Sequence, residues 1–155
     1  MPHLQRWPSP PIAKVYEAIS AIADGRVKLT EANEAQVRSS DGTKSYTVRW
    51  NESCKVFSSS DNASRFGHYI GYPIIAVLVE IGKLTLDRSL AHYLAGVPWK
   101  QLNDRFKRNY DRAVEHVLSG AEHAGADVAG IQRMAEEIYK QLVSLELIRE
   151  GKPMR

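Results

Sequence analysis

The segment that follows Gly71-Tyr72-Pro73 limits the possible folds more than any other part of the chain. Pro73 suits the first turn of a helix, and Gly82 is a natural end for that helix. A helix that is apolar around its whole circumference should be the most buried element of the protein. The run is far shorter than the roughly 18–20 residues that a membrane span needs. Its apolar side chains are Ile74, Ile75, Val77, Leu78, Val79 and Ile81.

Residues 26–57 alternate apolar and polar side chains with a period of two, which is typical of β-strands. Asp41-Gly42 separates two of these runs and is a strong hairpin signal. Cys54-Lys-Val-Phe57 predicts a fourth, short strand in which Cys54 is a buried structural thiol. We therefore predict an antiparallel meander with one polar, mostly basic face, and we expect the preceding helix to cover the other face. The apolar face comprises Val27, Leu29, Val37, Tyr46, Val48 and Trp50.

Helical periodicity dominates the rest of the chain. It predicts helices over residues 12–22 and 85–95, a long helix that begins at Pro98 and extends to Val117, and a last helix capped by Asp127. Four prolines within the first eleven residues predict an extended arm. The order indicates an α+β fold: an N-terminal helix, a meander and a C-terminal bundle of about four helices. The expected parts are an arm (1–11), an α+β core (12–84) and a helical bundle (85–150).

Composition excludes several classes of protein. The chain has 155 residues, of which 43% are hydrophobic and 25% charged, as is usual for a globular domain with a real core. Its single cysteine excludes an intrachain disulfide and a multi-thiolate metal site. The first residues lack the apolar stretch of a secretory signal, so we expect a cytoplasmic protein with no membrane association. No phosphate-binding loop, metalloprotease motif or nucleophile elbow occurs. We therefore predict no metal, no cofactor and no catalytic residue.

Residues 26–84 resemble the SWIM zinc-finger module. That module runs as a hairpin ending in a Tyr-x-Val strand, a Cys-x-Cys pair, a polar loop, a Cys-x-His pair and a short apolar helix. Tyr46-Thr-Val48 matches the strand, and Ile74-Ile-Ala-Val-Leu78 matches the helix. Ser58-Ser-Ser-Asp-Asn62 stands in place of the Cys-x-Cys segment, and Gly71-Tyr-Pro73 stands in place of Cys-x-His. Every metal ligand is replaced, so the resemblance implies a metal-free variant of the module.

A structural zinc site supplies much of the folding energy of a small module, so a metal-free variant needs a substitute. We expect aromatic packing and the fixed backbone of Pro73 to hold the loop of residues 58–73 against the following helix. The resemblance also implies a role in DNA processing or recombination through contacts with nucleic acid or protein. The residues with an expected structural role in the loop are Asp61, Asn62, His68, Tyr72 and Pro73.

The net charge of +3 is mildly basic and unevenly distributed. Residues 98–112 carry five basic side chains against two acidic ones. We therefore predict a non-enzymatic module that binds DNA or RNA through phosphates, with an affinity that falls steeply as salt rises. The candidate contacts are Arg38, Lys44, Arg49, Lys55 and Arg65 on the side of the sheet, and Lys100, Lys107 and Arg108 on the long helix.

Two other functions are compatible with the sequence. The last helix carries Val143, Leu147 and Ile148 beyond its main apolar stripe, which would suit a protein–protein adaptor or a homodimer. Asp61 as a base and Arg65 as an anion clamp would be the starting point of a small enzyme. Helix capping and turn formation explain the same two residues, so we expect binding rather than catalysis.

Overall fold

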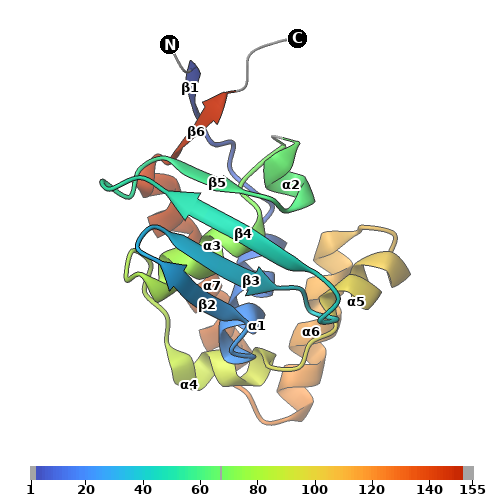
Figure 1. Cartoon of the computed structure of the whole chain (residues 1–155). Coiled ribbons are helices and arrows are strands. Elements are labelled where there is room, and N and C mark those ends of the chain that lie inside the picture. Colours follow the sequence, from blue (N-terminus) through green and yellow to red (C-terminus); the bar gives the residue numbers. More distant parts are fainter. Residues whose placement is uncertain (1–2, 67, 152–155) are drawn as a thin grey trace.

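A four-stranded antiparallel sheet and the helices on one side of it form the body of the protein (Figure 1). The computed structural model describes residues 3–66 and 68–151. The fold is the predicted α+β arrangement, with a meander followed by helices. The strands, in spatial order, are β2 (Val27–Glu31), β3 (Glu34–Arg38), β4 (Ser45–Trp50) and β5 (Phe57–Ser59).

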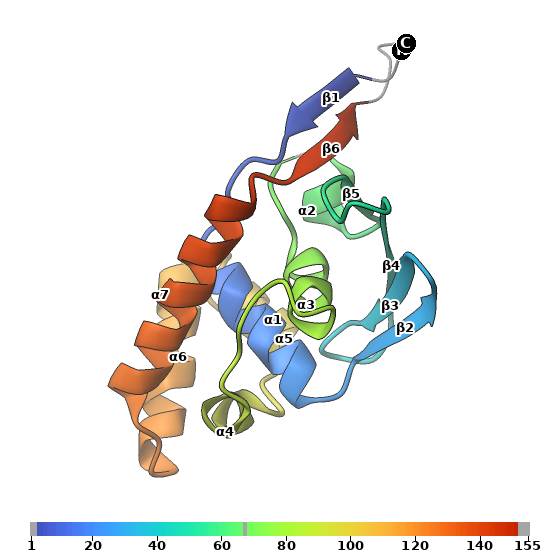
Figure 2. The same cartoon turned by 90° about the vertical axis from the view of Figure 1, so that its left-hand side faces the viewer.

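Helix α3 (Tyr72–Glu80) packs directly on the sheet, and helix α1 (Ala13–Ala23) packs on the far side of α3 (Figure 2). Residues Pro73–Val79 are buried, as their apolar character predicts. The prediction that the first helix covers the sheet is wrong, because the more apolar α3 takes that position. Helix α1 lies between α3 and the C-terminal helices, so residues 13–22 are all buried, including its polar side chains.

The buried face of the sheet is centred on β3 and β4. Ala35, Val37 and Val48 are fully buried, and Ala35 pairs with Val48 across the two strands. The expectation that Leu29 belongs to the buried face is wrong: it is 52% exposed because β2 is an edge strand that is exposed beyond Val27. The prediction of Cys54 in a strand is also wrong. Cys54 lies in the turn before β5 with a left-handed φ of 55°.

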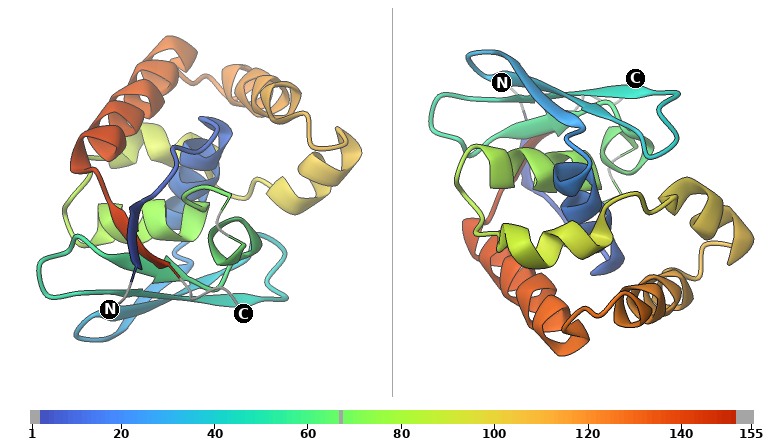
Figure 3. Two further views of the ribbon diagram at one scale, coloured as in Figure 1. Left: turned by 90° about the horizontal axis from the view of Figure 1, so that it is seen from above. Right: turned by 90° about the horizontal axis from the view of Figure 1, so that it is seen from below.

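The C-terminal helices curve around α1 (Figure 3). The predicted long helix from Pro98 is wrong, since the chain leaves the helix at Lys107 and Arg108, whose φ angles of 52° and 63° are left-handed. Gly120, which lies beyond the predicted end of that helix at Val117, is within the second of the two resulting helices. The elements are α4 (Arg88–Ala91), the 3-10 turn η1 (His92–Leu94), α5 (Trp99–Arg105), α6 (Tyr110–His123) and α7 (Val128–Leu145).

The two ends of the described chain pair with each other. β1 (His3–Arg6) and β6 (Ile148–Gly151) form an antiparallel ribbon that projects from the body (Figure 1). The sequence predicts an extended arm here but not this pairing, which joins residues from opposite ends of the chain. Residues 1–2 of the arm and residues 152–155 lie outside the described residues. No helix in the described ranges is long and apolar enough to cross a membrane.

The ribbon also changes the interpretation of the last helix. Helix α7 ends at Leu145, Leu147 is only 3% exposed, and Ile148 belongs to β6. Of the three residues expected to form an apolar docking stripe, Val143 alone is largely exposed, at 48%. One exposed valine does not form an apolar patch of the size that marks a protein interface.

Candidate functional site

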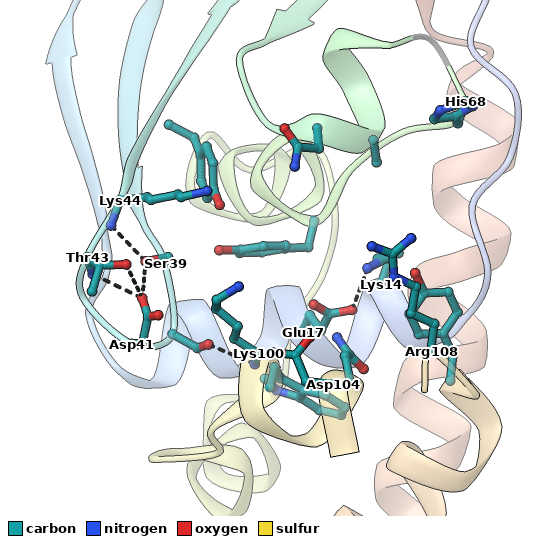
Figure 4. A pocket seen from close by; sticks show the side chains of 18 of the residues that line it. Lys14, Glu17, Ser39, Asp41, Thr43, Lys44, His68, Lys100, Asp104 and Arg108 are labelled. Carbon is teal, nitrogen blue, oxygen red and sulfur yellow. Dashed lines mark hydrogen bonds and ion pairs between the residues drawn. The ribbon is translucent and has the colours of Figure 1, made fainter. Parts of the chain in front are cut away.

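A pocket of about 460 Å³ lies where the β3–β4 hairpin, α1, the start of α3 and α5 meet (Figure 4). A further part of its wall is α2 (Asn62–Arg65) with the loop that follows it. The backbone N–H of Lys100 donates to the Ser40 hydroxyl at 3.2 Å, which ties α5 to the hairpin. Figure 4 shows Lys44 and Asp41 at one side of the pocket, Arg108 at the other, and Glu17 between them.

Six aromatic side chains line the pocket. The rings of Tyr46 and Tyr72 meet edge to face, with centroids 6.3 Å apart. Burial raises the pKa of Tyr72, and the Arg26 charge offsets part of that rise. Burial and the hydrogen bond with Tyr110 raise the pKa of Tyr69. These hydroxyls are therefore protonated at neutral pH and can donate hydrogen bonds. The six residues are Tyr46, Phe66, Tyr69, Tyr72, Trp99 and Tyr110.

Among the described residues, five cationic side chains line the same pocket and outnumber its three carboxylates. Lys44, Lys100 and Arg108 are among the predicted phosphate contacts, and the structure brings them together from the hairpin, α5 and the turn after α5. A cleft with an excess of one charge attracts ions of the other sign, so this pocket favours anions. The five cations are Lys14, Arg26, Lys44, Lys100 and Arg108.

The two cations that the sequence does not predict are held against aromatic rings. Lys14 Nζ lies 4.6 Å from the centroid of the Tyr110 ring. The Arg26 guanidinium lies 6.0 Å from the Tyr72 ring and donates to the carbonyl of Arg38 at 2.7 Å. Cations over aromatic faces are stabilised by the ring quadrupole. Both groups therefore belong to the wall of the pocket rather than to a freely moving surface.

The other predicted nucleic-acid contacts lie elsewhere and do not line this pocket. Arg49 is paired with Glu34 at 2.8 Å on the sheet. Lys55 Nζ donates to the carbonyl of Leu145 at 2.6 Å, close to the ribbon. The break after α5 also removes the expected basic side of a long helix. The residues outside the pocket are Arg38, Arg49, Lys55, Arg65 and Lys107.

Asp41 stabilises the turn between β3 and β4, at the edge of the pocket. Its Oδ1 accepts from the backbone N–H of Thr43 at 3.0 Å, from the Thr43 hydroxyl at 2.7 Å and from the Ser39 hydroxyl at 2.8 Å. These hydrogen bonds lower the pKa of Asp41 to about 2. Asp41 is therefore a charged turn residue at neutral pH and not a group that exchanges protons there.

The floor of the pocket is a buried acid–base pair on α1. Lys14 Nζ lies 2.9 Å from Glu17 Oε2, and the two side chains are only 11% and 7% exposed. Burial raises the pKa of Glu17, whereas the charge of Lys14 and hydrogen bonds with Lys14 and Asn103 oppose the rise. Perturbed carboxyl groups in clefts are concentrated at functional sites. Neither Lys14 nor Glu17 is among the site residues predicted from the sequence, although the two lie at an i, i+3 spacing on one helix.

Replacing Glu17 with glutamine is expected to remove a pH-dependent part of the stability. Because the folded-state pKa of Glu17 is raised from 4.5, its contribution to stability is fully present below pH 4.5 and is lost as pH rises through the folded pKa. The difference in unfolding free energy, wild type minus Glu17→Gln, should therefore fall with rising pH, by at most about 1.4 kcal/mol per pH unit. Urea denaturation at intervals from pH 4.5 to 8 measures this difference.

Two other carboxyls provide an internal check on that experiment. Hydrogen bonds lower the pKa values of Glu34 and Asp87. The stability that these two groups contribute is therefore lost as the pH falls below about 4.5, which is the opposite dependence to that of Glu17. Parallel stability curves for the wild type and Glu17→Gln above pH 4.5 would contradict the assignment to Glu17.

The turn after α5 holds two consecutive non-glycine residues in the left-handed region, Lys107 and Arg108. The backbone N–H of Arg108 donates to the carbonyl of Asn103 at 2.7 Å, and Asn109 then caps α6 by accepting from the N–H of Arg112 at 3.3 Å. Left-handed conformations destabilise non-glycine residues by about 1–2 kcal/mol each. Such strain is concentrated at functional sites, and here it directs Arg108 to the pocket.

Asp61 belongs to a buried network that fastens the loop before α3. Its carboxylate accepts from the backbone N–H of Ser64 at 3.1 Å, which caps α2, and from the hydroxyl of Ser59. The Ser64 hydroxyl in turn accepts from the backbone N–H of Gly71 at 3.0 Å. Asp61 is 5% exposed, and neither Asp61 nor Arg65 lines the pocket. The two therefore do not face it as base and anion clamp.

The other residues expected to hold the loop of residues 58–73 differ in whether they line the pocket. Asn62, His68 and Tyr72 line the pocket, and Pro73 lies in the first turn of α3. The backbone N–H of His68 donates to the carbonyl of Ala63 at 3.0 Å. Among residues 3–66 and 68–151, no three His, Cys, Asp or Glu side chains come together as a metal-binding group.

The pocket lies within a stretch of sequence that a known family shares. A family model described as "Uncharacterised conserved protein UCP014422" matches residues 7–148. No curated protein and no solved structure matches the chain. The family description does not bear on the SWIM-like resemblance, which therefore stays a prediction.

Proposed function

Because the chain belongs to the family of the uncharacterised conserved protein UCP014422, whose description states no activity, we infer its function from the pocket. We propose that the protein binds a nucleotide unit, either free or within single-stranded DNA or RNA. In this proposal the base lies among the tyrosines, and the phosphate lies against the cations that line the pocket. The phosphate contacts predicted from the sequence are thereby proposed to lie in a pocket and not on an open basic surface.

One observation carries the proposal: six aromatic rings and five cations surround a single volume of about 460 Å³. Sites for small ligands typically enclose about 300–1,000 Å³. Nucleobases of any sequence stack on aromatic side chains, and phosphates pair with lysine and arginine. A nucleotide unit matches both parts of the lining, whereas a purely apolar ligand would make no use of the excess positive charge.

The arrangement favours an unpaired nucleotide over a duplex. A base can reach the aromatic rings only when it is not stacked inside a double helix. Duplex binding through phosphates needs a continuous basic surface, and the predicted one depended on a long helix that the break at Lys107 and Arg108 removes. The remaining predicted cations outside the pocket include Arg49, whose charge is paired with Glu34.

Lys107→Gly and Arg108→Gly form a matched pair of variants that test the proposal. Both relieve a left-handed φ, so both should raise the unfolding free energy, by about 1 kcal/mol each. Only Arg108→Gly removes a cation that lines the pocket. We expect it to weaken the binding of a labelled mixed-sequence single strand about tenfold at low salt, while Lys107→Gly changes the affinity less than about twofold. Fluorescence anisotropy measures both affinities.

Competition then identifies the source of the nucleotide unit. Unlabelled nucleoside monophosphates that displace the strand indicate a free nucleotide as ligand, whereas displacement by oligonucleotides alone indicates a strand. Affinity for the strand should fall as salt rises from 50 to about 200 mM, because bound phosphates release counterions. Absence of binding to strand and monophosphates alike, or equal losses in the two glycine variants, would overturn the proposal.

A further inference from the structure

The exposed cations of the pocket stand on two sides of it. Lys44, on the β3–β4 hairpin, lies at one side, and Arg108, in the turn after α5, lies at the other (Figure 4). Lys100 belongs to the side of Lys44, because its backbone N–H donates to the hydroxyl of Ser40 in the hairpin. A ligand that meets both sides must therefore carry negative charge at two separate places.

These three cations are available to a ligand. In the part of the chain that the structure describes, no carboxylate lies within ion-pair distance of any of the three. The other two cations of the pocket are engaged, since Lys14 is paired with Glu17 at 2.9 Å and Arg26 with Asp24 at 3.1 Å. A ligand that binds the three exposed cations therefore displaces no internal ion pair.

Tyrosine rings connect the two sides of the pocket. Tyr46, on β4 directly after the hairpin, meets the ring of Tyr72 edge to face. Tyr69, three residues before Tyr72, forms a hydrogen bond with Tyr110 at the start of α6. The rings therefore continue from the hairpin to the side of Arg108, and an unpaired base has aromatic surface to stack on between the two groups of cations.

A nucleotide inside a strand carries one phosphate on its 5′ side and another on its 3′ side, whereas a free monophosphate or diphosphate is charged at one end only. We propose that the pocket holds an internal nucleotide of a single strand, with one of its two phosphates at Lys44 and Lys100 and the other at Arg108. This inference rests on the proposed binding of a nucleotide unit and adds that the unit belongs to a strand.

The surface next to Arg108 offers a path for the rest of the strand. The guanidinium groups of Arg105 and Arg112 each lie 5.4 Å from the centroid of the Phe106 ring, which holds them in place. Both arginines are exposed, and neither belongs to an ion pair among the described residues. Arginine pairs with phosphate through two parallel hydrogen bonds. We therefore expect the next phosphate on this side of the strand to lie against these two arginines.

Four adenosine nucleotides test the arrangement of the phosphates by isothermal titration. Adenosine 3′,5′-bisphosphate reaches both sides and should bind about tenfold more tightly than either the 5′- or the 3′-monophosphate. ADP also carries two phosphates, but both are at one end, so it should gain less than about threefold over the 5′-monophosphate. The comparison of the bisphosphate with ADP separates the position of the phosphates from their total charge.

Lys44→Gln and Arg108→Gly remove one cation from each side. Each should weaken the binding of the bisphosphate by about fivefold or more. Each should also weaken only one of the two monophosphates, and the affected monophosphate should differ between the variants. Lys44 holds the hairpin through its backbone N–H and carbonyl, so glutamine should keep the turn. Lys28→Gln removes an exposed lysine of β2 that does not line the pocket and should leave all affinities unchanged.

Arg112→Gln tests the path of the strand outside the pocket. It should weaken the binding of a labelled mixed-sequence single strand by about threefold or more, while the affinity for the bisphosphate stays within about twofold. Arg133→Gln removes an exposed arginine of α7 outside the pocket and is the matched control for both ligands. Equal effects of Arg112→Gln and Arg133→Gln on the strand would overturn the proposed path.

The failures are distinguishable. Equal affinities for the bisphosphate and ADP, or losses for the same monophosphate in Lys44→Gln and Arg108→Gly, overturn the two-sided arrangement and leave the proposed nucleotide site intact. A single strand that binds no more tightly than the bisphosphate identifies a free bisphosphate nucleotide as the ligand and overturns the assignment to a strand. Binding of none of the four nucleotides, together with no binding of single strands, overturns the nucleotide site itself.

Discussion

Replacing Gly71 with alanine is expected to destabilise the protein by about 3 kcal/mol or more. An alanine Cβ would overlap the Asp61 carboxylate, lying 2.7 Å from its Cγ, and would lie 2.8 Å from the Ser64 hydroxyl oxygen. Neither neighbour can move freely, because Asp61 caps α2 and Ser64 accepts from the N–H of residue 71. Chemical denaturation of the wild type and the variant measures the loss.

Gly120→Ala is the control for the general effect of adding a methyl group to a glycine. Gly120 lies within α6, has an ordinary φ and has no atom within 4 Å of the added Cβ. Alanine should therefore stabilise the protein there by about 0.5–1 kcal/mol. In an Asp61→Ala background the cost of Gly71→Ala should fall sharply, because the carboxylate atoms closest to the added Cβ are gone and only the Ser64 hydroxyl remains near it. A full cost in that background would show that the clash is not the cause.

Replacing Trp99 with alanine is expected to cost about 3–5 kcal/mol of unfolding free energy. Trp99 opens α5, is 2% exposed, and its indole N–H donates to the Ser20 hydroxyl of α1 at 2.8 Å. Trp99 thus connects α5 to the buried polar side of α1. The same substitution should weaken nucleotide binding more than tenfold, because α5 also carries Lys100 and Asn103.

Two further variants divide the effect of Trp99 into packing and hydrogen bonding. Trp99→Phe keeps an aromatic ring and should retain more than half of the stability that alanine loses. Ser20→Ala leaves the indole N–H buried without an acceptor and should cost about 1–2 kcal/mol. A loss below about 1 kcal/mol for Trp99→Ala, measured by denaturation, would contradict the role assigned to this residue.

Local chemistry predicts the parts of the fold that depend on short segments. The apolar run after Pro73 is helix α3, and Asp41-Gly42 is the turn between β3 and β4, where Gly42 adopts a φ of 76°. The break between α5 and α6 depends on tertiary structure instead. Lys107 and Arg108 are good helix formers, and Phe106 and Tyr110 keep a helical spacing, so only the capping ability of Asn109 hinted at a new helix.

The pocket shows why three of its five cations could be predicted and why the burial of its floor could not. The local excess of basic residues predicts Lys44, Lys100 and Arg108 as contacts for anions, because exposed cations attract anions by their charge whatever the fold. Lys14 and Glu17 lie on what reads as the solvent face of an amphipathic helix. Their burial follows from α5 covering that face, a contact between segments about 85 residues apart that no local pattern encodes.

The position of the β1–β6 ribbon determines where a tag or a fused domain would lie relative to the body of the protein. Residues 3 and 151 are paired neighbours, so both strands leave the body at one point (Figure 2). That point adjoins Val56, beside the Trp50 end of β4, whereas the hairpin turn that borders the pocket lies at the opposite, Ser45 end of this strand. A purification tag, a surface tether or a fused domain attached through either strand would thus hang clear of the pocket mouth. Immobilised protein should keep its ligand access whichever terminus is used.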